Sequence, residues 1–370
     1  MKIIKVSSAA DLKKFVRLPY QLYRHDDIWV PPLLSEVYSQ FDRKRNPTLE
    51  HCEYSLFLLE HGQRIIGRIA AFTDSIAIET WQEPVGLFGY YESIDDREAS
   101  AMLLDAAAGW LRDRGMKYMR GPWSFVSQEW GLVVEGFKPS PVVMAPYNPE
   151  YYLDHLVAYN LEKVKDLLVY YISAREGYSI PDRILTLTDD VANRFGIHTR
   201  PLNMKDYNDE VERVIELSNK SLISNWGYTS VTNEEARAIA HDLKPILQSR
   251  GVIFAEDRNG RPIGFAIAIP DVNTLIKDMR GSLFPFGWLK LMTGLPKLKS
   301  YRLFALGILP EYHGKGIDSL LYRALYETLY DPDLWLEINY VLEDNAPMNN
   351  AIIKLNAKPL RRYRIYQKAI

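Results

Sequence analysis

The sequence is poor in cysteine and has no long stretch without charge. The single cysteine, Cys52, excludes an internal disulfide and any zinc site built from several cysteines. The longest stretch without Asp, Glu, Lys or Arg is the 13 residues 221–233, whereas a membrane-spanning helix needs about 20 apolar residues. We therefore expect no integral membrane segment. Residues 1–15 carry Asp11 and no apolar core, so we expect no secretory signal and a cytoplasmic protein.

The chain also lacks an excess of either charge. Its 45 Lys and Arg residues stand against 47 Asp and Glu residues, a net charge of −2 over 370 residues. This balance excludes a general attraction to nucleic acid or anionic membrane, although it leaves a local basic patch open. The seven histidines have neither H-x-x-x-H nor H-E-x-x-H spacing, so we expect no metal site. Nothing in the sequence indicates an oligomeric state.

The two halves of the chain resemble each other. Residues 62–70 are similar to residues 260–268, and an apolar strand precedes each stretch, so each predicts a β-hairpin. Further along, each half has an apolar strand and then a helix with apolar residues at helical spacing. The hairpins are 197 to 198 residues apart, and Tyr170 and Tyr366, near the ends of the halves, are 196 apart. Such consistent offsets indicate a duplication.

We therefore predict a duplicated α+β unit, with halves at 1–175 and 195–370 and a linker at 176–194. Insertions at 123–150 and 273–299 interrupt the symmetry. The second insertion is unusually apolar. It is interpreted as a lid or a packing element between the halves, or as a segment that contacts a membrane surface.

The segment with the clearest chemistry is residues 306–318, where a strand passes through a glycine-containing loop into a helix. Such a junction presents backbone N–H groups and the positive end of a helix to an anion. Gly314 and Gly316 allow the backbone to approach a ligand closely, and Lys315 adds a positive charge. The spacing is neither that of a P-loop nor the complete Rossmann fingerprint.

This segment resembles the pyrophosphate loop of the GNAT acyltransferase superfamily, whose pattern is Q/R-x-x-G-x-G/A. His313 stands at the Gln/Arg place, Gly316 at the first glycine and Asp318 at the final Gly/Ala. The likeness covers most of 195–370 and, in weaker form, the first half. The chain as a whole resembles an uncharacterised bacterial group of tandem GNAT proteins.

The resemblance implies two GNAT-like domains in tandem, each a mixed, mostly antiparallel sheet flanked by helices. It implies a transferase whose second half binds acetyl-CoA or another acyl-CoA as co-substrate and passes the acyl group to a small-molecule or peptide amine. A backbone N–H within 307–309 would stabilise the oxyanion. The cofactor-binding residues that it implies are Ile308, Leu309, His313, Gly314, Lys315, Gly316, Ile317, Asp318 and Asn345.

Three departures from the family pattern affect the chemistry. Asp318 is a carboxylate at the start of a helix, where it either caps the helix or repels a pyrophosphate. Ile352 stands where many family members have a tyrosine that acts as general acid. The strand at 301–309 has no Asp or Glu that could act as the base. We predict Glu337 as the base, with Asp271 as a substitute, and Tyr228 and Tyr366 as possible acids. Each of these residues also fits a purely structural role.

The first half departs further. Its junction at 92–98 has four carboxylates and no glycine, so we expect it to bind no CoA and to act as a scaffold or acceptor platform. Adjacent residues on a strand point to opposite faces, so His51 and Cys52 are interpreted as structural. Three hypotheses for the whole chain stay open: a CoA-dependent N-acyltransferase, a non-catalytic GNAT-derived ligand-binding protein, and acyl transfer from an aminoacyl or peptidyl carrier.

Overall fold

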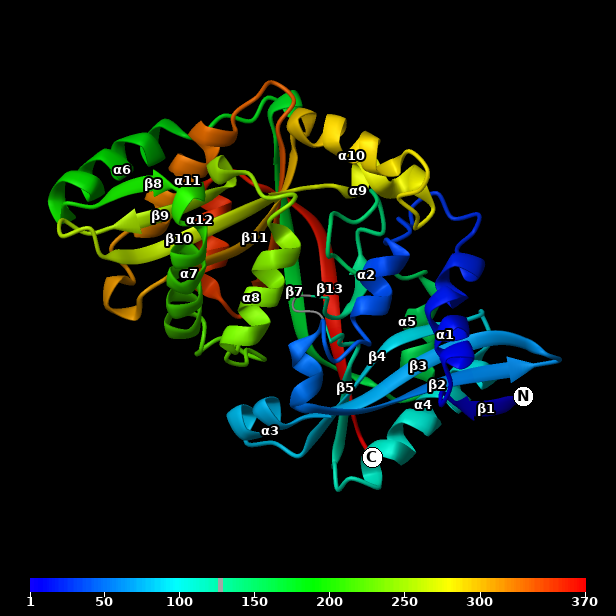
Figure 1. Cartoon of the computed structure of the whole chain (residues 1–370). Coiled ribbons are helices and arrows are strands. Elements are labelled where there is room, and N and C mark those ends of the chain that lie inside the picture. Colours follow the sequence, from blue (N-terminus) through cyan, green and yellow to red (C-terminus); the bar gives the residue numbers. More distant parts are fainter. Residues whose placement is uncertain (126–128) are drawn as a thin grey trace. The chain divides into compact units, whose positions relative to one another are not determined.

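The computed structural model describes residues 1–125 and 129–370, which form two compact units (Figure 1). Unit 1 comprises Met1–Leu167, Asn273–Leu289 and Arg361–Ile370, and unit 2 comprises Leu168–Val272 and Lys290–Leu360. The units are therefore not two consecutive halves of the sequence. Unit 1 takes its last strand from the end of the chain, and unit 2 takes a strand from the end of the first half.

Unit 1 contains a mixed sheet in which only one neighbouring pair of strands is parallel. The strands β1 to β4 pair antiparallel in sequence order, β4 pairs parallel with β5, and the C-terminal strand β13 pairs antiparallel with β5 and β6. The strands are β1 (Lys2–Lys5), β2 (Cys52–His61), β3 (Arg64–Asp74), β4 (Val85–Ser93), β5 (Tyr118–Gly121), β6 (Leu132–Glu135) and β13 (Lys358–Ala369).

Helices cover the sheet of unit 1, and their starts follow local capping rules. Ser8 accepts a hydrogen bond from the Asp11 N–H at the start of α1, and Asp96 accepts one from the Ala99 N–H at the start of α4. The helix α4 packs on β2, β3 and β4 with its predicted apolar stripe buried. The helices are α1 (Ala9–Leu22), α2 (Leu34–Ser39), α3 (Ser75–Trp81), α4 (Arg97–Arg112), α5 (Tyr151–Ala158) and α9 (Asn273–Ile276).

Unit 2 repeats this arrangement of strands. Its strands run in the spatial order β8-β9-β10-β11-β12-β7. The pairs from β8 to β11 are antiparallel, and β11 and β12 are parallel. The strands are β7 (Glu162–Ser173), β8 (His198–Pro201), β9 (Val252–Glu256), β10 (Pro262–Pro270), β11 (Ser300–Ile308) and β12 (Trp335–Leu342). The predicted α+β class, with two GNAT-like sheets in tandem, is confirmed.

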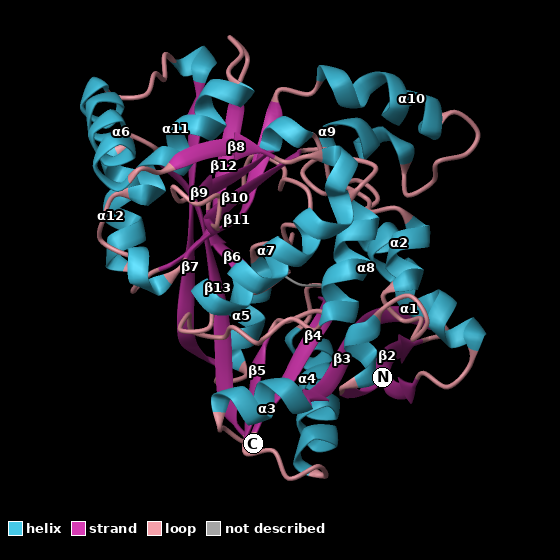
Figure 2. Ribbon diagram, turned by 60° about the vertical axis from the view of Figure 1, so that its left-hand side comes forward, coloured by secondary structure: helices cyan, strands magenta, loops and turns pink. Residues whose placement is uncertain are grey.

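Helices flank both faces of the sheet in unit 2 (Figure 2). The helix α7 packs on β10 and β11, whereas α11 packs on β9, β10 and α6. Residues 176–194, predicted as a linker, contain α6, whose Ile184, Thr188 and Val191 are buried. The helices are α6 (Asp182–Phe195), α7 (Tyr207–Ser221), α8 (Asn233–Leu243), α11 (Ile317–Leu329) and α12 (Ala346–Lys354), and α10 (Gly287–Gly294) spans the boundary between the two units in the sequence.

A buried ion pair holds the C-terminal strand within unit 1. The carboxylate of Asp166, which is 1% exposed, accepts hydrogen bonds from Arg364 Nε at 2.7 Å and Nη2 at 2.9 Å. Lys163 Nζ lies 3.1 Å from the same carboxylate. Burial alone would raise the pKa of Asp166, but the bonds to Arg364 and Lys163 outweigh it, so the pKa is lowered. The C-terminal strand is thus fastened by its side chains as well as by its backbone.

Asp166→Asn should lower the free energy of unfolding by about 2 kcal/mol, because the half-buried Arg364 loses its charge-assisted hydrogen bonds to a buried carboxylate. Glu216→Gln, which removes an exposed ion pair with Lys220, should cost less than about 1 kcal/mol. Urea unfolding measures both. Since the pKa of Asp166 is lowered on folding, its contribution is complete above the ordinary carboxylate pKa. It is lost as the pH falls below about 4. Equal losses in the two variants would contradict this role.

Candidate functional site

The two parallel strands of unit 2 separate part of the way along their length. β11 and β12 pair only from Ser300 opposite Trp335 to Leu303 opposite Ile338. The register between β10 and β11 shifts just beyond this point, around Phe304, and β11 then continues to Ile308 beside β10. Among the described residues, no strand pairs with the other edge of β11 over 304–308. The separation leaves an open backbone edge between the strands.

The loop after β11 forms a row of backbone donors. The Leu309 N–H donates to the Ile263 carbonyl at 2.9 Å, and a single 3-10 turn then leads toward α11. In the part of the chain that the structure describes, the N–H groups of Gly314, Lys315 and Gly316 have no acceptor. Among the described residues, the Ile317 N–H at the start of α11 also has no acceptor, whereas the Ser319 N–H donates to the Gly316 carbonyl at 3.1 Å. Together these groups form a cradle suited to an anion.

The two glycines of this loop are required by its conformation. Gly314 and Gly316 have φ values of +72° and +77°, in the left-handed region that favours glycine. A Cβ on Gly314 would meet no atom within 4 Å, so the space above the loop is open. A Cβ on Gly316 would come within 3.3 Å of Val191 Cγ2.

Side chains hold the loop in shape. His313 Nε2 donates to the Ile308 carbonyl at 2.8 Å, and the Ser319 hydroxyl donates to the Gly316 carbonyl. Lys315 is exposed, with its Nζ 4.7 Å from the centre of the Tyr312 ring. His313 therefore closes the loop through its imidazole, and Lys315 supplies a positive charge at its rim.

Asp318 does not cap the helix as one interpretation expected. The N-cap of α11 is Gly316, without a side-chain hydrogen bond, and Asp318 is the second residue of the helix. Burial raises the pKa of the Asp318 carboxyl, against the opposing effect of the backbone N–H groups of Asp318 and Ser319. Burial and the charge of Asp318 also raise the pKa of Tyr322, one turn further on. Asp318 thus faces the helix terminus from within the first turn.

Asn345 and Glu337 lie on the elements that follow. Asn345 caps α12 by accepting a hydrogen bond from the Met348 N–H at 3.2 Å. Glu337 is 1% exposed and lies opposite Arg302, one position before β11 and β12 separate. Asn339 Nδ2 donates to Glu337 Oε1 at 3.1 Å. The predicted base is therefore buried next to the point of separation.

The two predicted acids lie in different units. The Tyr228 hydroxyl donates to Asn219 Oδ1 at 2.8 Å, and burial raises the pKa of Tyr228 to about 12. Tyr366 lies on the part of β13 that belongs to unit 1, opposite Gly121, and burial raises its pKa. Tyr228 therefore shares a compact unit with the loop and Glu337, and Tyr366 does not.

In unit 1, backbone lies against the corresponding edge of β4 at Phe88 and Gly89. The strands β4 and β5 also separate, after Leu87 and Arg120. There, however, the Trp123 N–H donates to the Phe88 carbonyl at 2.8 Å, and a Cβ on Gly89 would overlap the Trp123 carbonyl oxygen. The backbone of residue 123 thus occupies the edge that is open in unit 2.

Several N–H groups at this junction have acceptors. The Ser93 N–H donates to the Tyr152 hydroxyl at 2.9 Å, and the Ile94 N–H donates to the Ile66 carbonyl at 3.1 Å. The bond from Ile94 to Ile66 corresponds to the bond from the Leu309 N–H to the Ile263 carbonyl in unit 2. Among the described residues, the junction of unit 1 therefore does not repeat the run of three successive unpaired N–H groups at 314–316, although the two units share one topology.

A buried polar cluster in unit 1 is the main feature that sequence reasoning missed. Glu92, grouped by sequence with the acidic residues at the helix start, points into the core instead. It accepts hydrogen bonds from the hydroxyls of Tyr23 and Tyr152 and from Arg68. Burial raises the pKa of Glu92, and Arg68 and the tyrosines oppose that effect. No periodic signal in the sequence could have found it, because β4 is buried without alternation from Val85 to Gly89.

His51 and Cys52 do not point apart as expected. His51 Nδ1 lies 2.8 Å from Asp74 Oδ1 and 3.9 Å from Cys52 Sγ. The expectation was wrong because His51 precedes β2, and its backbone, with φ −103° and ψ 4°, is not extended. The three side chains have ligand atoms within 4.8 Å of one another and are a group that could hold a metal ion. Asp74 is also used in capping α3.

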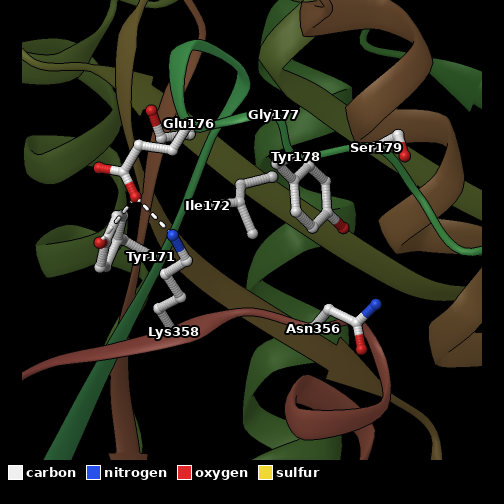
Figure 3. A pocket seen from close by; sticks show the side chains of 9 residues that line it. Tyr171, Ile172, Glu176, Gly177, Tyr178, Ser179, Asn356 and Lys358 are labelled. Carbon is white, nitrogen blue, oxygen red and sulfur yellow. Dashed lines mark hydrogen bonds and ion pairs between the residues drawn. The ribbon is translucent and has the colours of Figure 1, made fainter.

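A small cavity of about 220 Å³ lies elsewhere in unit 2 (Figure 3). Its two charged side chains bind each other, with Lys358 Nζ 2.7 Å from Glu176 Oε2, and the Tyr171 hydroxyl donates to the same carboxylate at 3.0 Å. None of the residues at 313–318 lines it. The cavity is lined by Tyr171, Ile172, Ser173, Glu176, Gly177, Tyr178, Ser179, Asn356 and Lys358. It is therefore separate from the donor cradle.

Solved structures share this fold over the full chain. A tandem GNAT protein from the clavulanic acid biosynthesis pathway superposes with a TM-score of 0.59 and 12% identity, covering 100% of this chain and 98% of that one. A GCN5-related N-acetyltransferase from Sphaerobacter thermophilus gives a TM-score of 0.55 and 12% identity, covering 99% and 95%. No family model matches the chain. The fold is that of the tandem GNAT acyltransferases.

Two proteins are similar in sequence over nearly their whole length. The bacterial ceramide synthase of Caulobacter vibrioides is 32% identical over 386 residues, covering 100% of this chain and 98% of that protein. Protein YghO of Escherichia coli is 32% identical over 368 residues, covering 97% and 93%. The chain belongs to the family that contains these two proteins. Within the described ranges, no helix has both the length and the apolar character needed to cross a membrane.

Gly89→Ala should destabilise unit 1 by about 3 kcal/mol or more, because the new methyl group overlaps backbone that occupies the edge of β4. Gly109→Ala in α4 is the matched control, since a Cβ there meets no atom within 4 Å. It should stabilise by up to about 1 kcal/mol. Thermal unfolding of both variants tests whether this edge is filled, and an unchanged midpoint for Gly89→Ala would show that it is open.

Proposed function

We propose that this protein is an acyl-CoA-dependent N-acyltransferase whose unit 2 holds the CoA pyrophosphate on the loop at 313–318. The observation that supports this most strongly is the row of unpaired N–H groups at Gly314, Lys315 and Gly316, beside the open edge of β11. Neutral backbone donors and a helix N-terminus bind phosphate without global positive charge, which suits a chain with a net charge of −2. In this proposal unit 1 serves as the scaffold or acceptor platform.

The open edge of β11 then receives the acyl thioester. Its backbone N–H groups are placed to donate to the thioester carbonyl and to stabilise the oxyanion as the acceptor nitrogen bonds to the carbonyl carbon. The C–N bond forms, the C–S bond breaks, the amine loses a proton and the thiolate gains one. Glu337, buried near the closed end of the separation, is the proposed base. Tyr228, protonated at neutral pH because its pKa is about 12, is the proposed acid within unit 2.

The acceptor that we propose is a long-chain amine. The relative of 32% identity that aligns over the whole chain is named a bacterial ceramide synthase, and a ceramide is the N-acyl derivative of a long-chain amino alcohol. A long-chain acyl-CoA is the matching donor. The residues that we assign to the donor side are those of the loop, with Asn345 at the start of the next helix.

The second candidate function is acyl-CoA binding without catalysis. Glu337 is 1% exposed, and the Tyr228 hydroxyl is already bonded to Asn219, so neither side chain is freely presented. The third hypothesis, transfer from an aminoacyl or peptidyl carrier, would not need CoA. The experiments below distinguish the three.

Gly316→Val should weaken acetyl-CoA and palmitoyl-CoA binding at least tenfold, measured by calorimetric titration. A β-branched side chain at φ +77° strains the loop and moves the donor N–H groups. Gly260→Val is the matched control, because Gly260 has φ +75° in the turn between β9 and β10, with open space around it. It imposes the same backbone strain away from the loop. Equal acyl-CoA affinity in the two variants would show that acyl-CoA does not bind at the loop. If the wild type binds no acyl-CoA at all, transfer from an aminoacyl or peptidyl carrier is the remaining catalytic hypothesis.

Glu337→Gln should lower kcat at least 100-fold with little change in KM, since general-base catalysis typically contributes about 10²–10⁴-fold. The assay follows the amide formed from sphinganine and palmitoyl-CoA by mass spectrometry. Glu216→Gln, an exposed carboxylate on α7, is the control and should keep full activity. An unchanged rate in Glu337→Gln would remove Glu337 from the mechanism. Binding of acyl-CoA without any amide product would favour the second candidate function.

A further inference from the structure

Large apolar side chains are exposed together on one short segment of the second insertion. Phe284 is 83% exposed, Phe286 74%, Trp288 49% and Leu289 46%, all within unit 1. We call these four residues the apolar tip. The next exposed apolar residue, Met292 at 67%, lies on the same helix. Single exposed apolar residues are ordinary, whereas a contiguous group marks an interaction site.

The base of this segment is fixed to unit 1. Gly281, with φ +81°, packs so closely that a Cβ there would lie 2.6 Å from Tyr20 Cε1 and 3.0 Å from the Pro32 carbonyl. The Leu34 N–H donates to the Gly281 carbonyl at 2.9 Å, and Lys277 Nζ donates to the Ser140 hydroxyl at 3.0 Å. The apolar tip is therefore displayed from an anchored base.

The tip also satisfies several of its own polar groups. The Trp288 backbone N–H donates to the Leu283 carbonyl at 3.2 Å, and its indole N–H donates to the Pro285 carbonyl at 3.1 Å. The Phe284 N–H donates to the Ser282 hydroxyl at 3.3 Å. Polar groups that are paired internally are cheaper to move into an apolar medium. This arrangement suits entry into lipid.

The sequence that contains the tip, from residue 279 to residue 310, carries charge of one sign. Between Asp278 and Glu311 the sequence has no Asp or Glu. Arg280, Lys290 and Lys297 within this stretch are exposed. In a chain with a net charge of −2, this is a local positive region beside an apolar tip. Anionic lipid headgroups attract such basic residues, and aromatic side chains favour the membrane interface.

We propose that the apolar tip inserts into the surface of an anionic lipid bilayer, with Arg280 of the same unit against the headgroups. We infer a lipid surface as the partner because exposed aromatic side chains and basic residues occur together in this segment, without acidic residues between them. The inference rests on exposure and charge and stands apart from the proposed function. If both hold, the protein works at the membrane, where a long-chain amine and its N-acyl product partition.

The test is co-sedimentation of the full chain with vesicles of phosphatidylcholine containing phosphatidylglycerol, and with vesicles of phosphatidylcholine alone. We expect binding that is strongest on the anionic vesicles. Phe284→Ser with Phe286→Ser should weaken it at least tenfold. Arg280→Glu should reduce the preference for phosphatidylglycerol.

Val157→Ser with Leu187→Ser is the matched control, because it also removes two exposed apolar side chains, 61% and 43% exposed, from other helices. It should bind vesicles like the wild type, and circular dichroism should show the same fold for all variants. Equal vesicle binding by the tip variant and the control would overturn the proposal. Failure of the wild type to sediment with either vesicle would also overturn the proposal. Analytical ultracentrifugation would then show whether the tip instead joins two copies of the chain. The tip variant should bind acyl-CoA with the affinity of the wild type, whatever the vesicle result. The membrane proposal and the proposed function can therefore be contradicted independently.

Discussion

The candidate site depends on one constraint in unit 2: two parallel strands that pair at four positions and then separate. Because β11 leaves β12 after Leu303, the rest of β11 pairs with β10, and among the described residues no strand pairs with its other edge. The bond from the Leu309 N–H to Ile263 ends the pairing at the far end. Directly after this bond the chain enters the loop whose N–H groups form the cradle. The same geometry places the buried Glu337 next to the point of separation.

The comparison between the two units shows how one topology supports different roles. Both units have the same strand order, and both end the corresponding strand with the same backbone bond. In unit 1 the backbone of Trp123 occupies the open edge, and the Tyr152 hydroxyl accepts from the junction N–H of Ser93. The same Tyr152 hydroxyl donates to Glu92 of the buried cluster. A duplicated fold has thus kept an open junction in only one copy, and the proposed division of labour follows from that difference.

Short-range signals predicted much of this architecture. The hairpins at 62–70 and 260–268, the stripe of α4 and the glycine-bearing loop depend on residues close together in the sequence, and all are present. The exchange of the last strands was missed, because strand periodicity does not encode which edge a strand joins. Glu92 was misjudged for a related reason: whether a polar side chain is buried depends on tertiary partners. The orientation of His51 was misjudged because its backbone is not extended. Asp318 does not cap its helix because the N-cap is Gly316, two residues earlier than the cap interpretation required.

The central claim is that backbone N–H groups of one junction, and not of the other, bind the pyrophosphate of acyl-CoA. Hydrogen exchange measured by NMR on the full chain, with and without palmitoyl-CoA, tests it most directly. The account predicts slower exchange at Gly314, Lys315 and Gly316 on addition of the ligand, and no change at residues 93–98. Protection at 93–98, or unchanged exchange at Gly314–Gly316 under saturating ligand, would contradict it.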